Sequence, residues 1–178
     1  MNSNIKNTIN RFSSISLNEM NSVALMKRTD TKFIINLSQL ILILKKIEKS
    51  YKVLEIKNDR IMSYSSLYFD TIDNKFYKDH HNGKNNRTKI RQRKYVESNL
   101  CFLEVKQKNG KGETKKSRIP VIDFELNLTK SSKEFISKTT NQEYNLEPSL
   151  WNGFNRVTLV NLKNKERVTL DLNLSYKI

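Results

Sequence analysis

The chain has 178 residues, which is enough for one domain with a hydrophobic core and short for two. Its formal net charge is +15 at pH 7, so we expect an acidic partner: nucleic acid, nucleotide, polyphosphate or an anionic membrane surface. A single cysteine, Cys101, excludes an internal disulfide and is typical of a reducing compartment. The longest apolar run, residues 40–44, is far shorter than the ~20 residues that span a bilayer, and the N-terminus has no apolar signal region. We therefore expect a single cytoplasmic domain over residues 1–178 with no transmembrane segment.

The N-terminal residues predict two short helices. Ile5, Ile9 and Phe12 recur at helical spacing, which predicts an amphipathic helix over residues 2–12. A capping-box pattern that starts at Ser16 predicts the second helix.

The next residues predict a long strand and then a helix. Residues 22–36 alternate between an apolar set and a partly charged set that includes Lys32, which is typical of a strand. A stripe of Leu and Ile then predicts a helix over residues 38–49, which Asn36 or Ser38 can cap.

The rest of the chain is predicted to be mostly strands separated by turn-forming residues. The predicted strands cover residues 53–56, 61–70, 88–96, 101–108, 115–122, 154–161 and 166–176. A helical turn near Phe76 and a helix over residues 129–139 interrupt them. About eight strands and few helices predict a mainly β (α+β) fold, an antiparallel barrel or strongly curved sheet with short flanking helices.

Three neighbouring strands between Thr88 and Arg118 carry regularly spaced ionic residues. Side chains at positions i, i+2 and i+4 of a strand share one face, so each strand presents its ionic residues on a single face. The seven residues are Lys89, Arg91, Arg93, Glu104, Lys106, Lys116 and Arg118. Six of them are basic, and such a surface suits a polyanion because each cation can neutralise one phosphate.

The sequence excludes several other kinds of site. It contains no GxxxxGK[ST] loop, and the pair His80-His81 has no carboxylate or cysteine partner at useful spacing. No Ser-His-Asp set occurs. Phosphoryl transfer needs none of these, because it depends mainly on holding phosphates in line and neutralising their charge.

The sequence leaves two possible roles open for each of three residues. Lys89 lies at a strand edge and is either a site cation or a solvated surface lysine. Glu104 is either a metal ligand or an ion partner that orients Arg91 or Arg93. Asp171 is either a metal ligand or half of a structural salt bridge.

Short blocks along the chain occur in the order of a known family. They are Leu25 to Phe33, Leu67 to Thr71, Asp79 to Gly83, Ile90 to Arg93, Phe102 to Lys106, Gly112 to Arg118, Phe154 to Arg156 and Glu166 to Asp171. With them the chain resembles the vacuolar transporter chaperone (VTC) domain, the polyphosphate polymerase branch of the triphosphate tunnel metalloenzymes.

The resemblance implies a tunnel of antiparallel strands with a basic inner wall. It implies catalytic roles for Arg91, Arg93, Lys106 and Lys116. It implies substrate-binding roles for Lys32, Arg118, Arg156, Arg167, Lys89 and Arg28. In this family ATP is the donor and inorganic polyphosphate the product, with Mn²⁺ or Mg²⁺ as the divalent metal and a membrane protein as a candidate partner for export at the inner membrane face.

The family domain normally continues beyond the strand that ends near Tyr176. That continuation carries a metal-binding glutamate and a Ser-Lys pair, so the main metal ligand is expected to lie beyond Ile178. Asp171 and Glu104 are then the remaining metal candidates in the chain. We expect residues 1–178 to bind triphosphate and polyphosphate but to make polymer slowly or not at all.

Other functions remain open from the sequence. The chain could be a polyphosphate- or nucleotide-binding module without turnover, or a hydrolase of short triphosphates. A single-strand nucleic-acid binder would require aromatic rings interleaved on the basic face. Tyr95 and Phe102 share that face, but we expect no nucleic-acid partner.

Overall fold

The computed structural model describes residues 3–21 and 30–178. Their strands pair in the order β1-β2-β7-β3-β4-β5-β6, and β8 pairs with β7. The two-residue β1 pairs in parallel with β2, whereas the pairs β2–β7, β3–β4, β4–β5 and β5–β6 are antiparallel. The predicted fold class, mainly β with short flanking helices, is confirmed.

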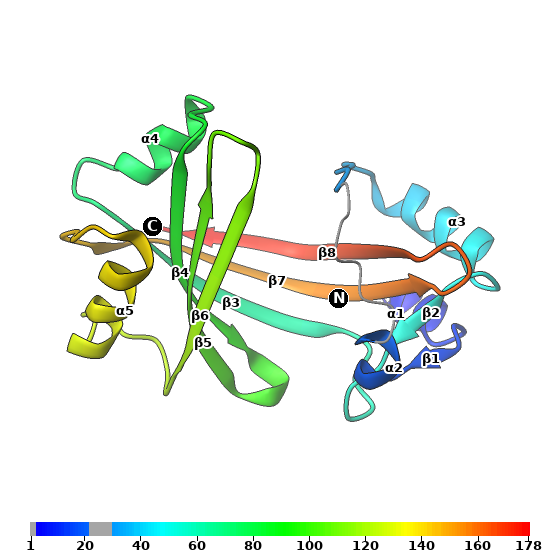
Figure 1. The fold of residues 1–178 in the computed structure, drawn as a ribbon. Coiled ribbons are helices and arrows are strands. Elements are labelled where there is room, and N and C mark those ends of the chain that lie inside the picture. The colour runs from blue at the N-terminus through cyan, green and yellow to red at the C-terminus, as the bar shows by residue number, and fades with distance from the viewer. Residues whose placement is uncertain (1–2, 22–29) are drawn as a thin grey trace. The chain divides into compact units, whose positions relative to one another are not determined.

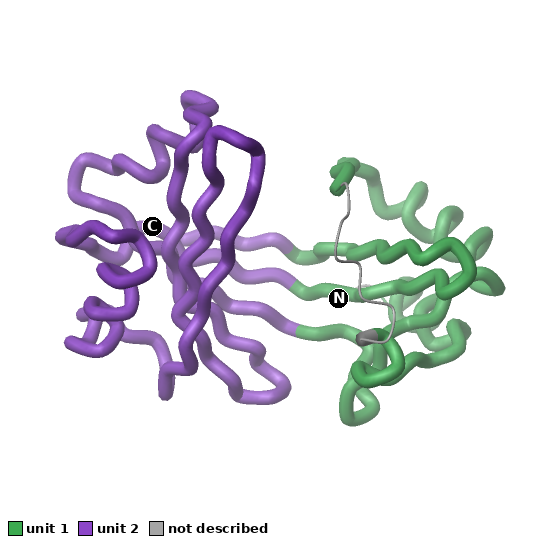
Figure 2. The backbone as a smooth tube through the Cα atoms, viewed as in Figure 1, with its two compact units in different colours: residues 1–62, 155–173 green, residues 63–154, 174–178 purple. Residues whose placement is uncertain are grey.

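The chain divides into two compact units (Figure 2). The first contains residues 1–62 and 155–173, and the second contains residues 63–154 and 174–178. Both β7 and β8 therefore contribute residues to each unit. A single domain over residues 1–178 stays a prediction.

The first unit packs short helices against strand segments. It comprises α1 (Ser3–Ile9), β1 (Ser14–Ile15), α2 (Leu17–Asn21), α3 (Leu37–Ile47), β2 (Lys52–Leu54) and parts of β7 (Glu147–Asn161) and β8 (Glu166–Lys177). Its core includes Ile9 from α1, Leu44 from α3 and Leu159 from β7, all of which are fully buried. The apolar side chains that recur at helical spacing in α1 and α3 thus pack into one core.

Two capping boxes set the starts of helices in this unit. The Ser16 hydroxyl accepts from the Glu19 amide, and the Glu19 carboxylate accepts from the Ser16 amide. Asn36 and Gln39 form the same reciprocal pair, so α3 begins at Leu37. Asn36, rather than the alternative Ser38, is the cap.

The predicted strand over residues 22–36 is wrong where the structure describes it. Residues 30–36, including Lys32, have no regular secondary structure, and the rest of the predicted strand, with Arg28, lies outside the described residues. Phe33 is 82% exposed and Ile34 is 103% exposed. Alternating residues form a strand only where another strand pairs with them, and within the described chain nothing pairs with this segment.

The second unit is built on the antiparallel ladder of the strands β3 to β6, which two helices cover on one face (Figure 1). It comprises β3 (Met62–Asp70), α4 (Lys75–His81), β4 (Arg87–Tyr95), the 3₁₀ turn Val96–Ser98, β5 (Leu100–Lys108), β6 (Thr114–Val121), α5 (Lys130–Thr140) and the first half of β7. Strands β4, β5 and β6 each begin one residue before the predicted start. Phe76 from α4 and Ile136 from α5 pack with Leu67, Ile90 and Leu103 in one buried cluster.

Strands β1 and β7 differ most from the prediction, and β2 covers residues 52–54 where 53–56 was predicted. The short β1 was not predicted, because two residues show no period. Strand β7 begins at Glu147 and not at Phe154, because Pro148 and Asn152 obscure its alternation. Trp151 on this added stretch packs edge-to-face on Phe124, with ring centroids 4.8 Å apart.

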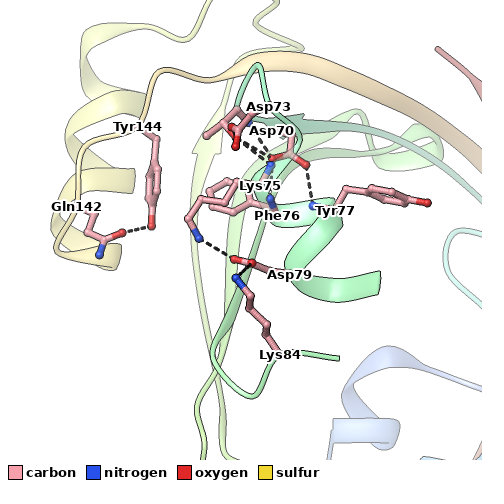
Figure 3. A network of polar contacts seen from close by, with 10 residues as sticks. Asp70, Asp73, Lys75, Phe76, Tyr77, Asp79, Lys84, Gln142 and Tyr144 are labelled. Carbon is pink, nitrogen blue, oxygen red and sulfur yellow. Dashed lines mark hydrogen bonds and ion pairs between the residues drawn. The ribbon is translucent and has the colours of Figure 1, made fainter. Parts of the chain in front are cut away.

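Helix α4 is held at the end of β3 by one carboxylate (Figure 3). Asp70 is 6% exposed and accepts hydrogen bonds from the backbone amides of Phe76 and Tyr77, both at 2.8 Å. The formal N-cap, Asn74, makes no side-chain cap bond. Asp70 therefore satisfies the free amides of the first helical turn from outside the helix.

None of the helices in the described residues is long and apolar enough to cross a lipid bilayer.

Replacing Asp70 with Ala should destabilise the protein by about 1–3 kcal/mol, because the buried amide of Phe76 and the partly buried amide of Tyr77 lose their acceptor. Urea unfolding at equilibrium measures this change. Asp73→Ala is the matched control, because Asp73 is exposed and its carboxylate accepts a hydrogen bond from the Thr71 hydroxyl at 2.6 Å. Equal losses in the two variants would show that the α4 start does not depend on Asp70.

Candidate functional site

The predicted ionic residues of β4, β5 and β6 lie on one face of the sheet. The register places Lys89, Lys106 and Lys116 directly opposite one another across the three strands. We call the seven residues Lys89, Arg91, Arg93, Glu104, Lys106, Lys116 and Arg118 the ionic face. The alternate residues of the same strands, which include Ile90 and Val105, are buried beneath α4 and α5. The core therefore fixes which side chains the sheet presents on its other face.

The three aligned lysines, Lys89, Lys106 and Lys116, repel one another and so destabilise the sheet slightly. Like charges directly opposite on neighbouring strands repel one another, typically by a fraction of a kcal/mol per pair. A bound polyanion would convert this repulsion into attraction. Lys106 and Lys116 are exposed, so both are accessible to such a ligand.

Arg91 is held in place by two partners from adjacent strands. Its Nε and Nη2 lie 2.8 and 2.7 Å from Glu104 Oε2, and its Nη1 donates to the Tyr68 hydroxyl at 3.0 Å. Burial opposes its charge, but Tyr68 and Glu104 outweigh this effect and raise the pKa of Arg91. Of the two interpretations of Glu104, the geometry favours the ion partner that orients Arg91.

Arg93 has a different environment although it lies on the same face. It is 8% exposed, its Nε donates to Ser66 Oγ at 3.1 Å, and its guanidinium carbon lies 5.5 Å from the ring centroids of both Tyr64 and Phe154. No carboxylate of the described chain forms an ion pair with it. Burial and the neighbouring Arg91 charge lower the pKa of Arg93, although an arginine stays protonated. A buried cation without a carboxylate partner is costly, and an anionic ligand would offset that cost.

Aromatic rings surround the arginines. Tyr64 stacks on Phe154 at 5.0 Å and meets Tyr95 edge-to-face at 5.1 Å. Phe102 lies under Arg118, whose guanidinium carbon is 4.5 Å from the ring centroid. These rings orient the guanidinium groups through cation–π contacts.

The sequence interpretation missed the contribution of β3 to this site. Tyr64, Ser66 and Tyr68 lie opposite Tyr95, Arg93 and Arg91 in the antiparallel register. The two-residue spacing of Tyr64, Ser66 and Tyr68 in the predicted strand 61–70 indicates that they share one face. It does not indicate that this face adjoins the arginines, because that depends on the pairing of β3 with β4.

The first unit contains the later candidate residues. Arg156 of β7 makes a bidentate pair with Asp171 of β8, with Nε–Oδ1 at 2.6 Å and Nη2–Oδ2 at 2.7 Å. This geometry favours the salt-bridge interpretation of Asp171. Arg167 is exposed on β8, and Lys32 is exposed in the irregular segment 30–36.

The described residues do not fit the expected divalent metal. They contain no group of three His, Cys, Asp or Glu side chains that could hold an ion. The two candidate ligands, Glu104 and Asp171, each form an ion pair with an arginine. A Mn²⁺ or Mg²⁺ site stays a prediction.

Comparisons with known proteins give a family match. A family model described as the VTC domain matches residues 27–177. A solved structure from Vibrio parahaemolyticus, described as a candidate adenylate cyclase, is 14% identical, with 80% of this chain and 69% of that chain covered and a TM-score of 0.48. No curated protein matches the chain.

Glu104→Gln should strengthen tripolyphosphate binding by about two- to fivefold, because the ionic face gains one net positive charge and Arg91 loses a competing carboxylate. Isothermal titration calorimetry with and without Mn²⁺ measures this. Glu134→Gln on α5 is the control, since it makes the same charge change at an exposed position of a helix on the other face. Weaker binding that appears only when Mn²⁺ is present would instead identify Glu104 as a metal ligand.

Proposed function

Because this chain belongs to the VTC domain family, we propose that its ionic face binds the phosphates of ATP and of inorganic polyphosphate. A triphosphate-binding domain is the broader role that family membership supports. The more specific proposal is transfer of the terminal phosphoryl group of ATP to the end of a polyphosphate chain.

One observation carries the proposal: Arg93 is a buried guanidinium with no carboxylate partner in the described chain, next to Arg91 on a face of aligned lysines. A buried arginine normally pairs with an acid of its own protein. Here the contacts orient Nε toward Ser66 and stack the group between two rings. The remaining N–H donors are suited to two oxygens of one phosphate.

In the proposed reaction, the arginines and the lysines of the ionic face bind different phosphates. The bond between the γ-phosphorus and the β–γ bridging oxygen breaks, ADP leaves, and a terminal polyphosphate oxygen forms the new bond to phosphorus. Arg91 and Arg93 would hold and neutralise the transferring group. Lys106 and Lys116 would hold the neighbouring phosphates, so the attacking oxygen and the leaving oxygen stay in line. No side chain needs to act as a covalent nucleophile.

Arg93→Gln should weaken tripolyphosphate binding roughly 10- to 100-fold, because a charge-assisted contact contributes ~1.5–3 kcal/mol. Lys94→Gln is a matched control on the next residue of β4. Lys94 pairs with Asp123 on the other face of the sheet, so its loss should have only a small effect. Fluorescence or calorimetric titration at constant salt measures both dissociation constants.

Single-stranded DNA of equal charge serves as the comparison ligand in the same titrations. We expect tripolyphosphate to bind more tightly, since the arginines are arranged for terminal phosphate oxygens. Comparable affinity for both ligands across a salt series would favour the nucleic-acid alternative. Equal effects of the Arg93 and Lys94 substitutions would indicate a diffuse basic surface.

Incubation with ATP and Mn²⁺, followed by gel staining for polyphosphate and measurement of released phosphate, tests the reaction itself. Polymer together with ADP, formed slowly, is the outcome that supports the proposed reaction. Free phosphate without polymer would favour the triphosphate hydrolase, and neither product would favour a binding module without turnover. Loss of each product in Arg93→Gln would link the reaction to the ionic face.

A further inference from the structure

The sheet surface that carries the ionic face has a different composition at its two ends. Every second residue of a strand lies on this surface, and each two-residue step covers about 7 Å. On β4 these positions run from Arg87 through the cations of the ionic face to Tyr95. On β5, Phe102 lies opposite Arg93, and the lysines follow farther along the strand. Among the surface positions of β4, β5 and β6, rings occur only at Tyr95 and Phe102, so one end is aromatic and the other is basic.

The ring of Phe102 lies beneath a guanidinium group. Arg118 is opposite Glu104 in the register, but Glu104 forms its ion pair with Arg91. The Arg118 side chain lies instead over Phe102, with its guanidinium carbon 4.5 Å from the ring centroid. Arg118 is exposed, and within residues 3–21 and 30–178 no carboxylate forms an ion pair with it. The guanidinium therefore has a ring on one side and is accessible to a second planar group on the other.

The neighbouring rings hold Phe102 in position. Tyr95 meets Phe102 edge-to-face at 6.0 Å and Tyr64 edge-to-face at 5.1 Å. Tyr64 in turn stacks on Phe154, and both rings lie beside Arg93. Phe102 and Tyr95 are half-buried, so part of each ring stays accessible. Side chains that are already fixed by packing lose little conformational entropy when a planar ligand stacks on them.

A nucleobase matches the aromatic end of this surface. Bases stack on aromatic rings and on arginine guanidinium planes, and this stacking tolerates any base because every base has a π-face. The adjacent surface positions, Leu100 and Pro120, have no polar side chain that could contact the edge of a base. Four residues separate Tyr95 from Arg91, which is about 14 Å along β4. A nucleoside at the rings therefore places its phosphates beside Arg93 and Arg91.

We propose that Tyr95, Phe102 and Arg118 form a nucleobase subsite, in which the base stacks on the Arg118 guanidinium next to the two rings. The subsite depends on the function proposed above, because the triphosphate of the same nucleotide lies along Arg93 and Arg91. Stacking without edge contacts favours purines, which offer more area, and separates ATP from GTP only weakly. A nucleic-acid strand fits less well, because it requires rings interleaved along the basic positions.

Calorimetric titration of the full chain with ATP and with methyl triphosphate, in buffer without divalent metal, tests the subsite. Methyl triphosphate carries the same charge as ATP but has no nucleoside, so the ratio of the two affinities isolates the contribution of the nucleoside. We expect ATP to bind roughly tenfold more tightly, because stacking of one base contributes about this much. Equal affinity would overturn the subsite and leave phosphate binding by the ionic face intact. Absence of binding by both ligands would overturn the proposed function as well.

The identity of the base gives a second measurement in the same titration. GTP should bind within about threefold of ATP, and CTP should bind more weakly than both, because its single ring offers less stacking area. A difference of tenfold or more between ATP and GTP would contradict recognition by stacking.

Two ring substitutions locate the stacking. Phe102→Leu removes the ring beneath Arg118 and keeps an apolar side chain, so the ratio of ATP affinity to methyl triphosphate affinity should fall roughly fivefold. Tyr77→Leu is the matched control, because Tyr77 is 63% exposed and its ring stacks on His81 within α4, which covers the other face of the sheet. The control should leave the ratio unchanged. Partial unfolding would weaken both ligands equally, so an unchanged ratio in Phe102→Leu would overturn the proposal.

Nuclear Overhauser effects between ATP and the unmodified chain give a measurement that does not depend on variants. At saturating ATP we expect contacts from adenine H2 or H8 to the ring protons of Phe102 or Tyr95. Contacts that involve only other rings, such as Tyr77, would overturn the subsite.

Discussion

The antiparallel register of β4, β5 and β6 determines where the chemistry of the second unit lies. Each strand alternates between a residue that packs under α4 and α5 and a residue that joins the ionic face. Fully burying one large apolar side chain contributes ~1.5–3 kcal/mol, whereas a like-charge pair across two strands costs a fraction of one kcal/mol. The core cluster contains eight buried apolar residues. Burial of the core therefore stabilises an arrangement of cations that would not assemble by itself.

The two arginines of β4 show how position on one face still gives different chemistry. Arg91 has a carboxylate and a phenol as fixed partners, so its charge is compensated within the protein. Arg93 has a hydroxyl and two rings, which orient it but do not neutralise it. Arg91 is therefore held rigidly by protein partners, whereas binding of an anion would compensate the charge of Arg93, which has no carboxylate partner in the described chain.

The strands of the second unit could be predicted because the alternation of apolar and polar residues and the positions of turn-forming residues indicate the same strand boundaries. The ionic face follows from the same alternation. Contacts between strands could not be predicted, since they depend on which strands pair and in which register. Tyr68 and Ser66 were missed as arginine partners for this reason, and the roles of Glu104 and Asp171 stayed open until their ion pairs were seen. The segment from Asp30 to Asn36 shows the opposite error: it alternates like a strand, but within the described residues no strand pairs with it.

The strict alternation of β4 also limits how this protein can change over time. An exchange of one side chain alters one face and leaves the other intact, so the cations and the core can vary independently. Insertion or deletion of one residue inside β4 is different, because it would turn every following side chain to the opposite face. Arg91 and Arg93 would then enter the core while Ile90 and Gln92 faced outward. Changes in length are therefore expected to accumulate in the hairpin from Asn109 to Glu113 and in the loop after α4, and the strands between them should keep a constant number of residues.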